Sequence, residues 1–573
     1  MIPRNEHPNP GFFRENYVIL NGEWDFDFDF GNSGEEKKLY ENDCKLSKKI
    51  NVPFCPESEL SGINYKDFMA AVWYKKTVTV TKEQLAIGKA FIVFGAVDFH
   101  ARIFINGKFA GEHFGGYTSF RIDATDFLSE GDNIITVYAQ DDTRSPLQAR
   151  GKQSELLYSH DCDYTRTTGI WQTVYMEFCP VNYIKNFKVF PNIDNATVTI
   201  SADIVGEGDF CATAFWNGAE VGKSSVKTFG QTVTVTVALS EKHLWEVGKG
   251  GLYALKLSFG GDEVSSYFGL REVKLCSDGL KINGKTVFQR LILDQGFYPD
   301  GIYTAPSAEA LKNDILLSMK VGFNGARLHQ KIFEPLFLHY CDELGYIVWG
   351  EHGNWGANHT IFESLRYYLL EIEEEIERDF NHPSIIGWCP YNETWDIDGK
   401  KQDNDILRIV YRTVKSMDKT RPCIDTSGNF HVETDIFDVH DYEQDYNVFK
   451  ANYDKLFTEN TLYDRFSHLQ KWHGEPVFVS EYGGIRIDLS NPENDREKAW
   501  GYGNAATSLE EFYERYDGLT TAMIDNPKMI GFCYTQLTDV EQELNGIYNY
   551  DRTEKFDSEV LYKINSKKAA IEE

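Results

Sequence analysis

The hydrophobic pattern of the chain changes its period near residue 280, and this change limits the fold more than any other feature. Up to about residue 273, short runs such as WYKKTVTV and TVTVTVAL alternate apolar with polar residues and are separated by turn residues. Beyond residue 280, apolar strand-like runs alternate with helical segments such as AEALKNDILLSMKVG. The first pattern is typical of β-sandwiches and the second of a parallel α/β fold, so the 573-residue chain is predicted to contain several domains.

Three domains follow from these patterns. Residues 1–181 and 182–273 are each predicted to form a β-sandwich, the second of the size of an immunoglobulin-like domain. Asn106-Gly107 stands between two alternating runs and is the positive-φ pair that a two-residue hairpin turn requires. Residues 274–573 contain eight strand-like runs, which indicates a (β/α)8 TIM barrel. These runs are TVFQRLILD, FNGARL, YIVWGE, IIGWCPYNE, CIDTSG, FDVHDY, VFVSEYG and MIGFCYTQL.

The overall charge restricts the class of partner. A formal net charge of -30 and a pI near 4.9 disfavour nucleic acid and anionic membranes, which so acidic a surface would repel. The sequence contains neither an uncharged apolar stretch of about 18 residues nor, at its start, the apolar region of a secretory signal, so a soluble cytoplasmic protein is expected. The ten cysteines are scattered without a CxxC pair, which favours free thiols over disulfides.

Polar side chains stand at the ends of all eight predicted barrel strands. In a TIM barrel these ends meet at one mouth, where catalytic groups are found, so the strand-end residues are candidates for a site. They are Asp294, Arg327 with His329, Glu351, Asn392 with Glu393, Thr426 with Ser427, His440 with Asp441 and Tyr442, Glu481 with Tyr482, and Gln536.

Glu393 and Glu481 suit the hydrolysis of a glycosidic bond. That reaction needs one carboxyl group to protonate the leaving oxygen and an ionised one at the anomeric carbon, and a separation of about 5 to 5.5 Å would mean direct attack with retention. We expect the pKa of Glu393 to be raised by the other carboxylate, and Glu481 to stay ionised through donors such as Tyr482, Tyr442 and Arg327. The dipeptide Asn392-Glu393 is weak by itself, because Asn-Glu also occurs at residues 5 and 6; its strand context supports the assignment.

Segments in all three domains resemble one enzyme family. The first domain contains NYVILNGEWDFDFD, AVWYKKTVTV, INGKFAGEHFGGYTSFRIDATDFL and TTGIWQTVYME, and the second ends in YFGLREV. The barrel carries FNGARLHQ, CDELGYIVWGE, SIIGWCPYNETWD and VFVSEYGG. In this order they resemble glycoside hydrolase family 2, which includes β-galactosidases, β-glucuronidases and β-mannosidases. The resemblance implies a sugar-binding jelly roll for the first domain, Glu393 as general acid/base and Glu481 as nucleophile.

The same resemblance implies roles for the neighbouring residues. Asn392, Arg327 and Tyr442 fall where the family keeps site residues. His329 and His440 are expected to bind sugar hydroxyls, with structural histidines as the alternative.

Two further carboxylates stand at the barrel mouth. Glu351 and Asp294 are expected either to contact the substrate or to be ion-paired beneath it, and the sequence leaves both readings open.

The chain departs from the family pattern in two places. β-Glucuronidases carry an Asn-x-Lys-Gly motif just before a Gly-Ile-Phe/Tyr run, whereas this chain has Glu-Leu-Asn-Gly at residues 543–546, so uronic acid substrates are disfavoured. Many members also keep a Trp in the final strand that this chain lacks, which leaves Tyr534, Gln536 and Glu543 near the subsite. Trp355, Trp395 and Trp388 are candidates to replace it as stacking platforms.

These observations predict a retaining exo-acting glycoside hydrolase. A neutral β-D-galactoside is the first expected substrate, an α-L-arabinoside or β-D-galactofuranoside the nearest alternative, and a β-glucuronide less favoured. The rival from another class is a non-catalytic carbohydrate-binding protein of the same architecture. No cofactor or metal is expected, because the chemistry requires none and no obvious carboxylate cluster is devoted to a cation. Association into a homo-oligomer is left open.

Overall fold

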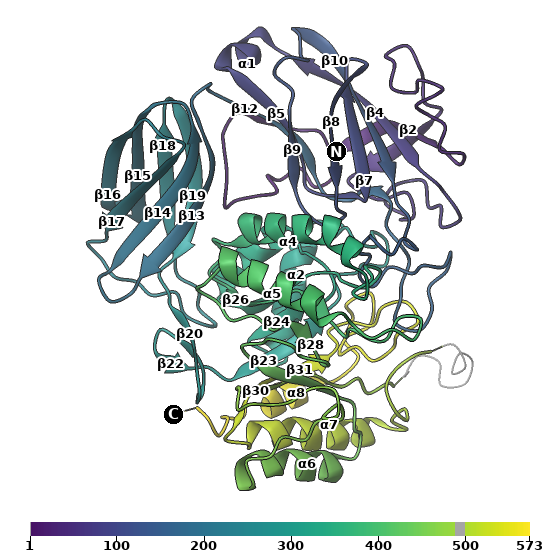
Figure 1. Ribbon diagram of the computed structural model, residues 1–573, viewed down its shortest axis with the longest axis vertical. Helices are drawn as coiled ribbons and strands as arrows, with labels where there is room; N and C mark the ends of the chain where they lie inside the picture. The colour runs from purple at the N-terminus through teal and green to yellow at the C-terminus, as the bar shows by residue number, and fades with distance from the viewer. Residues whose placement is uncertain (1, 488–498, 573) are drawn as a thin grey trace.

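The computed structural model describes residues 2–487 and 499–572 and confirms the predicted fold class of two β-sandwiches and a TIM barrel. In Figure 1 the purple first sandwich lies above the barrel, the teal second sandwich lies at its side, and the green and yellow barrel fills the lower half. The ten cysteines are all free, as expected. Among the described residues, every helix is too short or too polar to cross a membrane.

The first sandwich packs two antiparallel sheets around one apolar core, to which both sheets contribute. The turn at Asn106 (φ 51°) and Gly107 (φ 75°) joins β7 (His100–Ile105) to β8 (Lys108–Phe114), which confirms the predicted hairpin. The larger sheet is ordered β3 (Lys48–Val52), β2 (Gly22–Phe28), β4 (Val72–Val80), β10 (Gly131–Gln140), β7 (His100–Ile105), β8 (Lys108–Phe114). The smaller is β1 (Tyr17–Ile19), β12 (Val174–Cys179), β5 (Lys89–Phe94), β9 (Phe120–Asp123), beside helix α1 (Lys82–Ile87) and the pair β6 (Val97–Asp98) and β11 (Gly169–Ile170).

The second sandwich shows why its strands read as alternating in the sequence. In β17 (Thr232–Ala238) every valine is buried and every threonine exposed, because successive side chains point to opposite faces of the sheet. Its sheets are β13 (Tyr183–Asn192), β14 (Thr197–Val205), β17 and β16 (Ala219–Thr228), β15 (Gly208–Trp216), β18 (Leu252–Phe259), β19 (Asp262–Gly269). A small sheet of β20 (Val273–Cys276), β21 (Gly279–Ile282) and β22 (Lys285–Thr286) leads to the barrel.

All eight strand-like runs of the barrel contain strands of the structure. Seven form one parallel sheet in the order β26 (Ile385–Cys389), β25 (Ile347–Glu351), β24 (Gly325–Leu328), β23 (Gln289–Asp294), β31 (Met529–Thr535), β30 (Val477–Gly483), β29 (Phe437–Asp441). The remaining run supplies only the short strand β28 (Thr426–Ser427), which pairs with β27 (Tyr391–Asn392). The helices are α2 (Ala308–Lys320), α3 (Pro335–Leu344), η1 (Phe362–Ser364), α4 (Leu365–Asp379), α5 (Asn404–Met417), α6 (Tyr446–Thr458), α7 (Leu509–Ile524) and α8 (Ser558–Asn565).

A buried arginine links the two sandwiches. Arg14 donates to both oxygens of Asp262 on β19, at 2.9 Å each, and to Glu177 Oε1 on β12, also at 2.9 Å. The carbonyl of Ile184 accepts a further bond at 2.6 Å, so most of the donors of this guanidinium group are occupied. The contact therefore fixes the orientation of one sandwich against the other.

Removing this arginine is expected to destabilise the paired sandwiches. Arg14→Met leaves two buried carboxylates without their cation, which costs about 3 to 5 kcal/mol of the free energy of unfolding. Urea denaturation followed by tryptophan fluorescence measures the loss. The control is Lys38→Met, which breaks an exposed pair with Glu41 and is expected to change stability by less than about 1 kcal/mol. Equal stability of the two variants would contradict the prediction.

Candidate active site

A cavity of about 420 Å³ opens at the ends of the barrel strands and contains both candidate catalytic carboxylates. Glu393 follows β27, and Glu481 lies within β30. One carboxylate oxygen of each, together with a ring nitrogen of His440, lies within 4.8 Å of the others. This separation matches direct attack by one carboxylate rather than attack by an intervening water, which needs about 6.5 to 9.5 Å.

Glu481 is buried and held by two donors. Arg327 Nη1 donates to its Oε1 at 3.1 Å, and the Tyr442 hydroxyl donates to its Oε2 at 2.5 Å. The Tyr442 ring stacks on Tyr502, which fixes the hydroxyl in place. The expectation that Tyr482 also donates to Glu481 is wrong. Neighbouring residues of a strand point to opposite faces, and the Tyr482 hydroxyl bonds Thr520 on α7 instead.

Glu393 adopts a left-handed backbone conformation, with φ 49°, which is uncommon for a residue that is not glycine. Such a conformation persists where the surroundings require it, and here it directs the carboxylate toward the cavity. Its Oε1 lies 2.7 Å from His440 Nδ1, and its Oε2 accepts a bond from Trp395 Nε1 at 3.2 Å. The same His440 Nδ1 lies 3.4 Å from Glu481 Oε2, so the imidazole bridges the two carboxylates.

The raised pKa expected for Glu393 is contradicted in the free protein. Burial acts to raise the pKa of this carboxyl, but the hydrogen bond and charge of His440, with the nearby Lys152 and the bond from Trp395, lower it to about 2. Burial likewise acts to lower the pKa of His440, but Glu481 and Glu393 together raise it. The sequence-based expectation considered only the repulsion from Glu481. The imidazole of His440, which lies between the two carboxylates, has the opposite effect on the pKa of Glu393.

Glu351 belongs to the support beneath the cavity rather than to its wall. Arg327 Nη2 donates to Glu351 Oε2 at 2.6 Å, and His329 Nδ1 lies 2.8 Å from Glu351 Oε1. Burial acts to raise the pKa of Glu351, but Arg327 and His329 lower it to about 2, so it is an ion-paired carboxylate. Arg327 Nη2 also donates to Asn392 Oδ1 at 3.0 Å, which leaves the Asn392 amide nitrogen for the cavity.

The sequence-predicted residues therefore divide into two groups. His329, Trp355, Asn392, His440 and Tyr442 line the cavity with Glu393 and Glu481. Arg327, Glu351, Gln536 and Asp294 lie outside its wall, so the expected substrate contact of Gln536 is not seen. Arg327 is the donor to Glu481 that the sequence predicted, and of the two readings left open for Glu351 the ion-paired one applies.

Neighbouring groups occupy two of these outlying side chains. Gln536 is held between Gln295 and Asn545, at 2.8 and 2.9 Å. Asp294 accepts a bond from the backbone of Gly296, and burial together with Asp314 raises its pKa to about 7.

The first sandwich supplies a wall of the cavity that sequence reasoning missed. Lys152 and Cys162, from the long loop between β10 and β11, line it together with barrel residues. The Lys152 ammonium lies 3.8 Å from the centre of the Trp355 ring and is 5% exposed. Throughout the described residues, no carboxylate reaches it within ion-pair distance. No local motif marks this lysine, because only the docking of two domains brings it to the site.

Glu543 forms the wall near Lys152. This carboxylate is 1% exposed and accepts bonds from Tyr164 and from Asn545 Nδ2, the latter at 2.9 Å. Burial raises the pKa of Glu543 more than Lys152 lowers it. A carboxylate and an ammonium thus face the same end of the cavity. Trp395 and Trp500 also line the cavity, whereas Trp388 does not: its indole nitrogen donates to Asp418.

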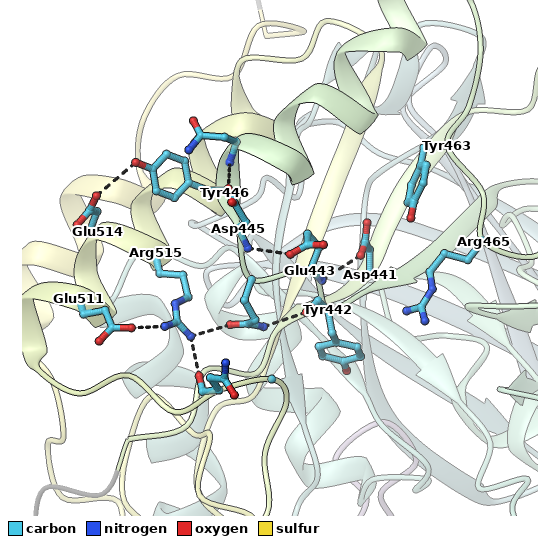
Figure 2. Close-up of a pocket in the computed structure, with 14 residues that line it drawn as sticks. Asp441, Tyr442, Glu443, Asp445, Tyr446, Tyr463, Arg465, Glu511, Glu514 and Arg515 are labelled. Atoms are coloured by element: carbon cyan, nitrogen blue, oxygen red, sulfur yellow. Dashed lines mark hydrogen bonds and ion pairs between the residues drawn. The ribbon is translucent and has the colours of Figure 1, made fainter.

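A second, more open hollow of about 810 Å³ adjoins the cavity and shares Tyr442 and Arg465 with it. Figure 2 shows its polar lining, in which Arg515 bridges Glu511 and Gln444. Arg465, at the junction of the hollow and the cavity, is exposed.

Within residues 2–487 and 499–572, two clusters of side chains have donor atoms close enough to hold a cation. One is made of His440 and the two candidate catalytic carboxylates, Glu393 and Glu481; the other is Glu155, His160 and Asp163. Arg150 already pairs with both carboxylates of the second cluster. Neither cluster provides an observation that assigns a metal to the site.

Models of two domains of one family match the chain. Residues 18–180 match "Glycosyl hydrolases family 2, sugar binding domain", and residues 304–567 match "Glycosyl hydrolases family 2, TIM barrel domain". A β-galactosidase of Thermoanaerobacterium thermosulfurigenes is 26% identical over 84% of this chain and 66% of its own length. A β-galactosidase of Priestia megaterium is 23% identical over 87% of this chain and 49% of its own length. The chain thus spans about half to two thirds of these curated relatives.

Solved structures share the whole fold. A β-glucuronidase from an uncultured Clostridium has a TM-score of 0.79 and 22% identity, covering 96% of this chain and 98% of its own. A Bifidobacterium dentium β-glucuronidase complexed with coumarin-3-O-glucuronide has a TM-score of 0.79 and 19% identity, with coverage of 97% and 98%. At these identities the likeness shows the fold alone.

Proposed function

Because the chain belongs to glycoside hydrolase family 2, we propose that it is a retaining exo-glycosidase, in which Glu481 is the nucleophile and Glu393 the general acid/base. The proposal rests on one observation: oxygens of the two carboxylates lie within 4.8 Å of each other in a cavity at the barrel mouth. Arg327 and Tyr442 each donate a hydrogen bond to the proposed nucleophile and hold its carboxylate in one orientation.

The proposed reaction is a double displacement. Glu481 attacks the anomeric carbon and the glycosidic bond breaks, while Glu393 gives a proton to the leaving oxygen. Water then attacks the anomeric carbon, Glu393 takes one of its protons, and the bond to Glu481 breaks. The Asn392 amide, oriented by Arg327, is placed to donate to the hydroxyl beside the anomeric carbon.

The shape of the site favours action on a terminal sugar. The loop of the first sandwich lines the cavity with Lys152, next to Glu543, and we infer that this wall stops the chain of a polysaccharide from passing through. The leaving group is proposed to lie in the second hollow beyond Tyr442 and Arg465 (Figure 2).

A neutral β-D-galactoside is the proposed substrate. Glu543 supports it, because a carboxylate in the wall accepts bonds from sugar hydroxyls and repels the carboxylate of a uronic acid. The curated relatives named β-galactosidase point the same way.

A β-glucuronide is the second candidate, and Lys152 favours it. An ammonium group without an ion-pair partner among the described residues is placed to bind a uronate, and solved structures of the same fold are named β-glucuronidases. In this second reading, Lys152 of the first sandwich would bind the uronate in place of the lysine that the Asn-x-Lys-Gly motif supplies in β-glucuronidases.

A panel of 4-nitrophenyl glycosides tests the proposed function. It contains the β-D-galactoside, β-D-glucuronide, α-L-arabinofuranoside and β-D-galactofuranoside, and NMR of the first-formed sugar anomer reports retention. Hydrolysis of the galactoside above all others is expected. Sugar binding without turnover of any member would support the non-catalytic reading instead. Light scattering of the same sample tests for a homo-oligomer.

Glu543 and Lys152 are expected to set the choice between neutral and acidic sugars. Glu543→Gln removes the repulsion and leaves the Lys152 cation, so the ratio of kcat/KM for galactoside over glucuronide is expected to fall by about 10- to 100-fold, the effect of one hydrogen bond to a charged group. Lys152→Met is expected to lower any activity on the glucuronide further. The control is Asp161→Asn, an exposed charge on the same loop. An unchanged ratio in Glu543→Gln would show that the selection lies elsewhere.

A further inference from the structure

His440 touches the proposed acid, the proposed nucleophile and a buried serine. Its Nδ1 lies 2.7 Å from Glu393 Oε1 and 3.4 Å from Glu481 Oε2, and its Nε2 lies 3.0 Å from Ser427 Oγ. The ring rests against Gly428, where a Cβ atom would stand 2.4 Å from the imidazole carbon Cγ. The site is therefore built to hold this imidazole in one orientation.

The hydroxyl proton of Ser427 is already committed. Ser427 Oγ donates to Asp438 Oδ2 at 2.5 Å, and the same oxygen of Asp438 accepts bonds from Ser480 Oγ and from the backbone of Gly428. Burial acts to raise the pKa of Asp438, but His431, His440 and Ser427 lower it to about 2, so Asp438 is a carboxylate that only accepts. The oxygen of Ser427 is left to accept a bond from His440 Nε2–H.

This assignment determines what lies on the other side of the ring. A neutral imidazole with its proton on Nε2 has a bare Nδ1, and a bare nitrogen does not approach a carboxylate oxygen to 2.7 Å without a proton between them. One additional proton therefore lies between His440 Nδ1 and Glu393 Oε1. It is bound either to an imidazolium or to the carboxylic acid.

We propose that the acid proton of this enzyme is shared by Glu393 and His440, and that His440 is a positioning residue that holds the proton on Nδ1 until the leaving oxygen arrives. The inference rests on the proposed function of Glu393. It also replaces the sequence-based expectation that His440 binds a sugar hydroxyl.

The charges around His440 favour this arrangement. Glu393 after β27, Glu481 on β30 and Asp438 on its own strand β29 all attract a proton to the ring, whereas Arg327 on β24 opposes it. His431 stands behind Asp438, 3.2 Å from its Oδ1, and its other nitrogen lies 2.7 Å from Asp425. Burial acts to lower the pKa of His431, but these two carboxylates raise it well above its usual value.

The proton can follow the chemistry in both steps. In the first, the shared proton passes from His440 Nδ1 through Glu393 to the leaving oxygen, which leaves a neutral imidazole and an ionised Glu393. The covalent bond to Glu481 removes a negative charge that had held the proton on the ring. In the second, Glu393 takes a proton from the attacking water, the bond from Glu481 to the sugar breaks, and the restored Glu481 charge draws the proton back to Nδ1. No co-reactant beyond water is needed.

The pH dependence of His440→Gln tests the inference. A shared proton is lost at higher pH than a proton on Glu393 alone, so the basic limb of kcat/KM is expected to move down by about one pH unit or more in the variant. Turnover of a poor leaving group is expected to fall by about 10- to 100-fold, and that of 2,4-dinitrophenyl glycosides by less. Ser427→Ala keeps the imidazole but removes the acceptor of its Nε2–H, so the basic limb of kcat/KM is expected to move in the same direction by a smaller amount. A basic limb that stays in place in His440→Gln would overturn the proposal.

A second measurement does not depend on turnover. In the full chain labelled with ¹⁵N-histidine, the resonances of His440, assigned by their loss in His440→Gln, are expected to report an imidazolium protonated at both nitrogens at neutral pH. In Glu393→Gln the pKa of His440 is expected to fall by about one unit or more, since a carboxylate partner is lost. A neutral ring with bare Nδ1 in the unmodified protein overturns the inference. If every glycoside resists hydrolysis while the imidazolium is observed, the proposed function fails and the proton assignment stands.

Discussion

Replacing Glu481 by Gln is expected to lower kcat on every substrate by a factor on the order of 10⁴ or more, the scale seen when one member of a catalytic group is removed. The amide keeps the shape of the side chain but cannot attack the anomeric carbon. Because Arg327 still pairs with Glu351 and the amide still fills the space beside Tyr442, the variant is expected to fold normally. Rates with 4-nitrophenyl glycosides and circular dichroism measure both properties.

The nucleophile assignment has a positive test as well. Glu481→Gly opens space next to Arg327 and Tyr442, and added azide is expected to attack the sugar there and yield a glycosyl azide of inverted configuration. The matched control is Glu510→Gln, which removes an exposed carboxylate from the first turn of α7 and is expected to leave rates unchanged. Full activity of Glu481→Gln would refute the assignment.

Replacing Glu393 by Ala is expected to divide substrates by their leaving group. Phenols of low pKa leave without protonation, so 2,4-dinitrophenyl glycosides keep most of their rate in the first step, whereas alkyl glycosides lose about 10²- to 10⁴-fold. A plot of log kcat/KM against leaving-group pKa is expected to steepen in the variant. Equal losses on good and poor leaving groups would indicate that Glu393 supports the fold of the site and does not donate the proton.

The fold was predictable because it follows from local periodicity. Alternation such as that of residues 232–238 places one face of a strand in a core, and the change to helix-strand repeats beyond residue 280 leaves few architectures other than a barrel. That Glu393 and Glu481 meet in one cavity was predictable for the same reason, since parallel strands of a barrel bring their ends together.

The rest depends on packing that a sequence does not record. Arg327 and Gln536 stand at strand ends, but neighbouring side chains bind them beneath the cavity. The pKa of Glu393 falls instead of rising because His440 from another strand lies between the two carboxylates. No sequence motif marks Lys152 as a site residue. It reaches the cavity only because the first sandwich packs against the barrel.

Lys152 belongs to a different domain from Glu393 and Glu481. Selection can therefore change the residues that contact the sugar without changing the residues proposed to break the bond. The two proposed catalytic carboxylates stand in or directly after barrel strands, where their spacing tolerates little variation, but one wall of the proposed sugar site is a loop of the first sandwich. Substitutions or length changes in that loop are expected to alter which sugar is accepted and to leave the proposed catalytic groups unchanged. Substrate preference in such a chain can therefore diverge faster than its chemistry, and swapping the loop alone is a route to new selectivity.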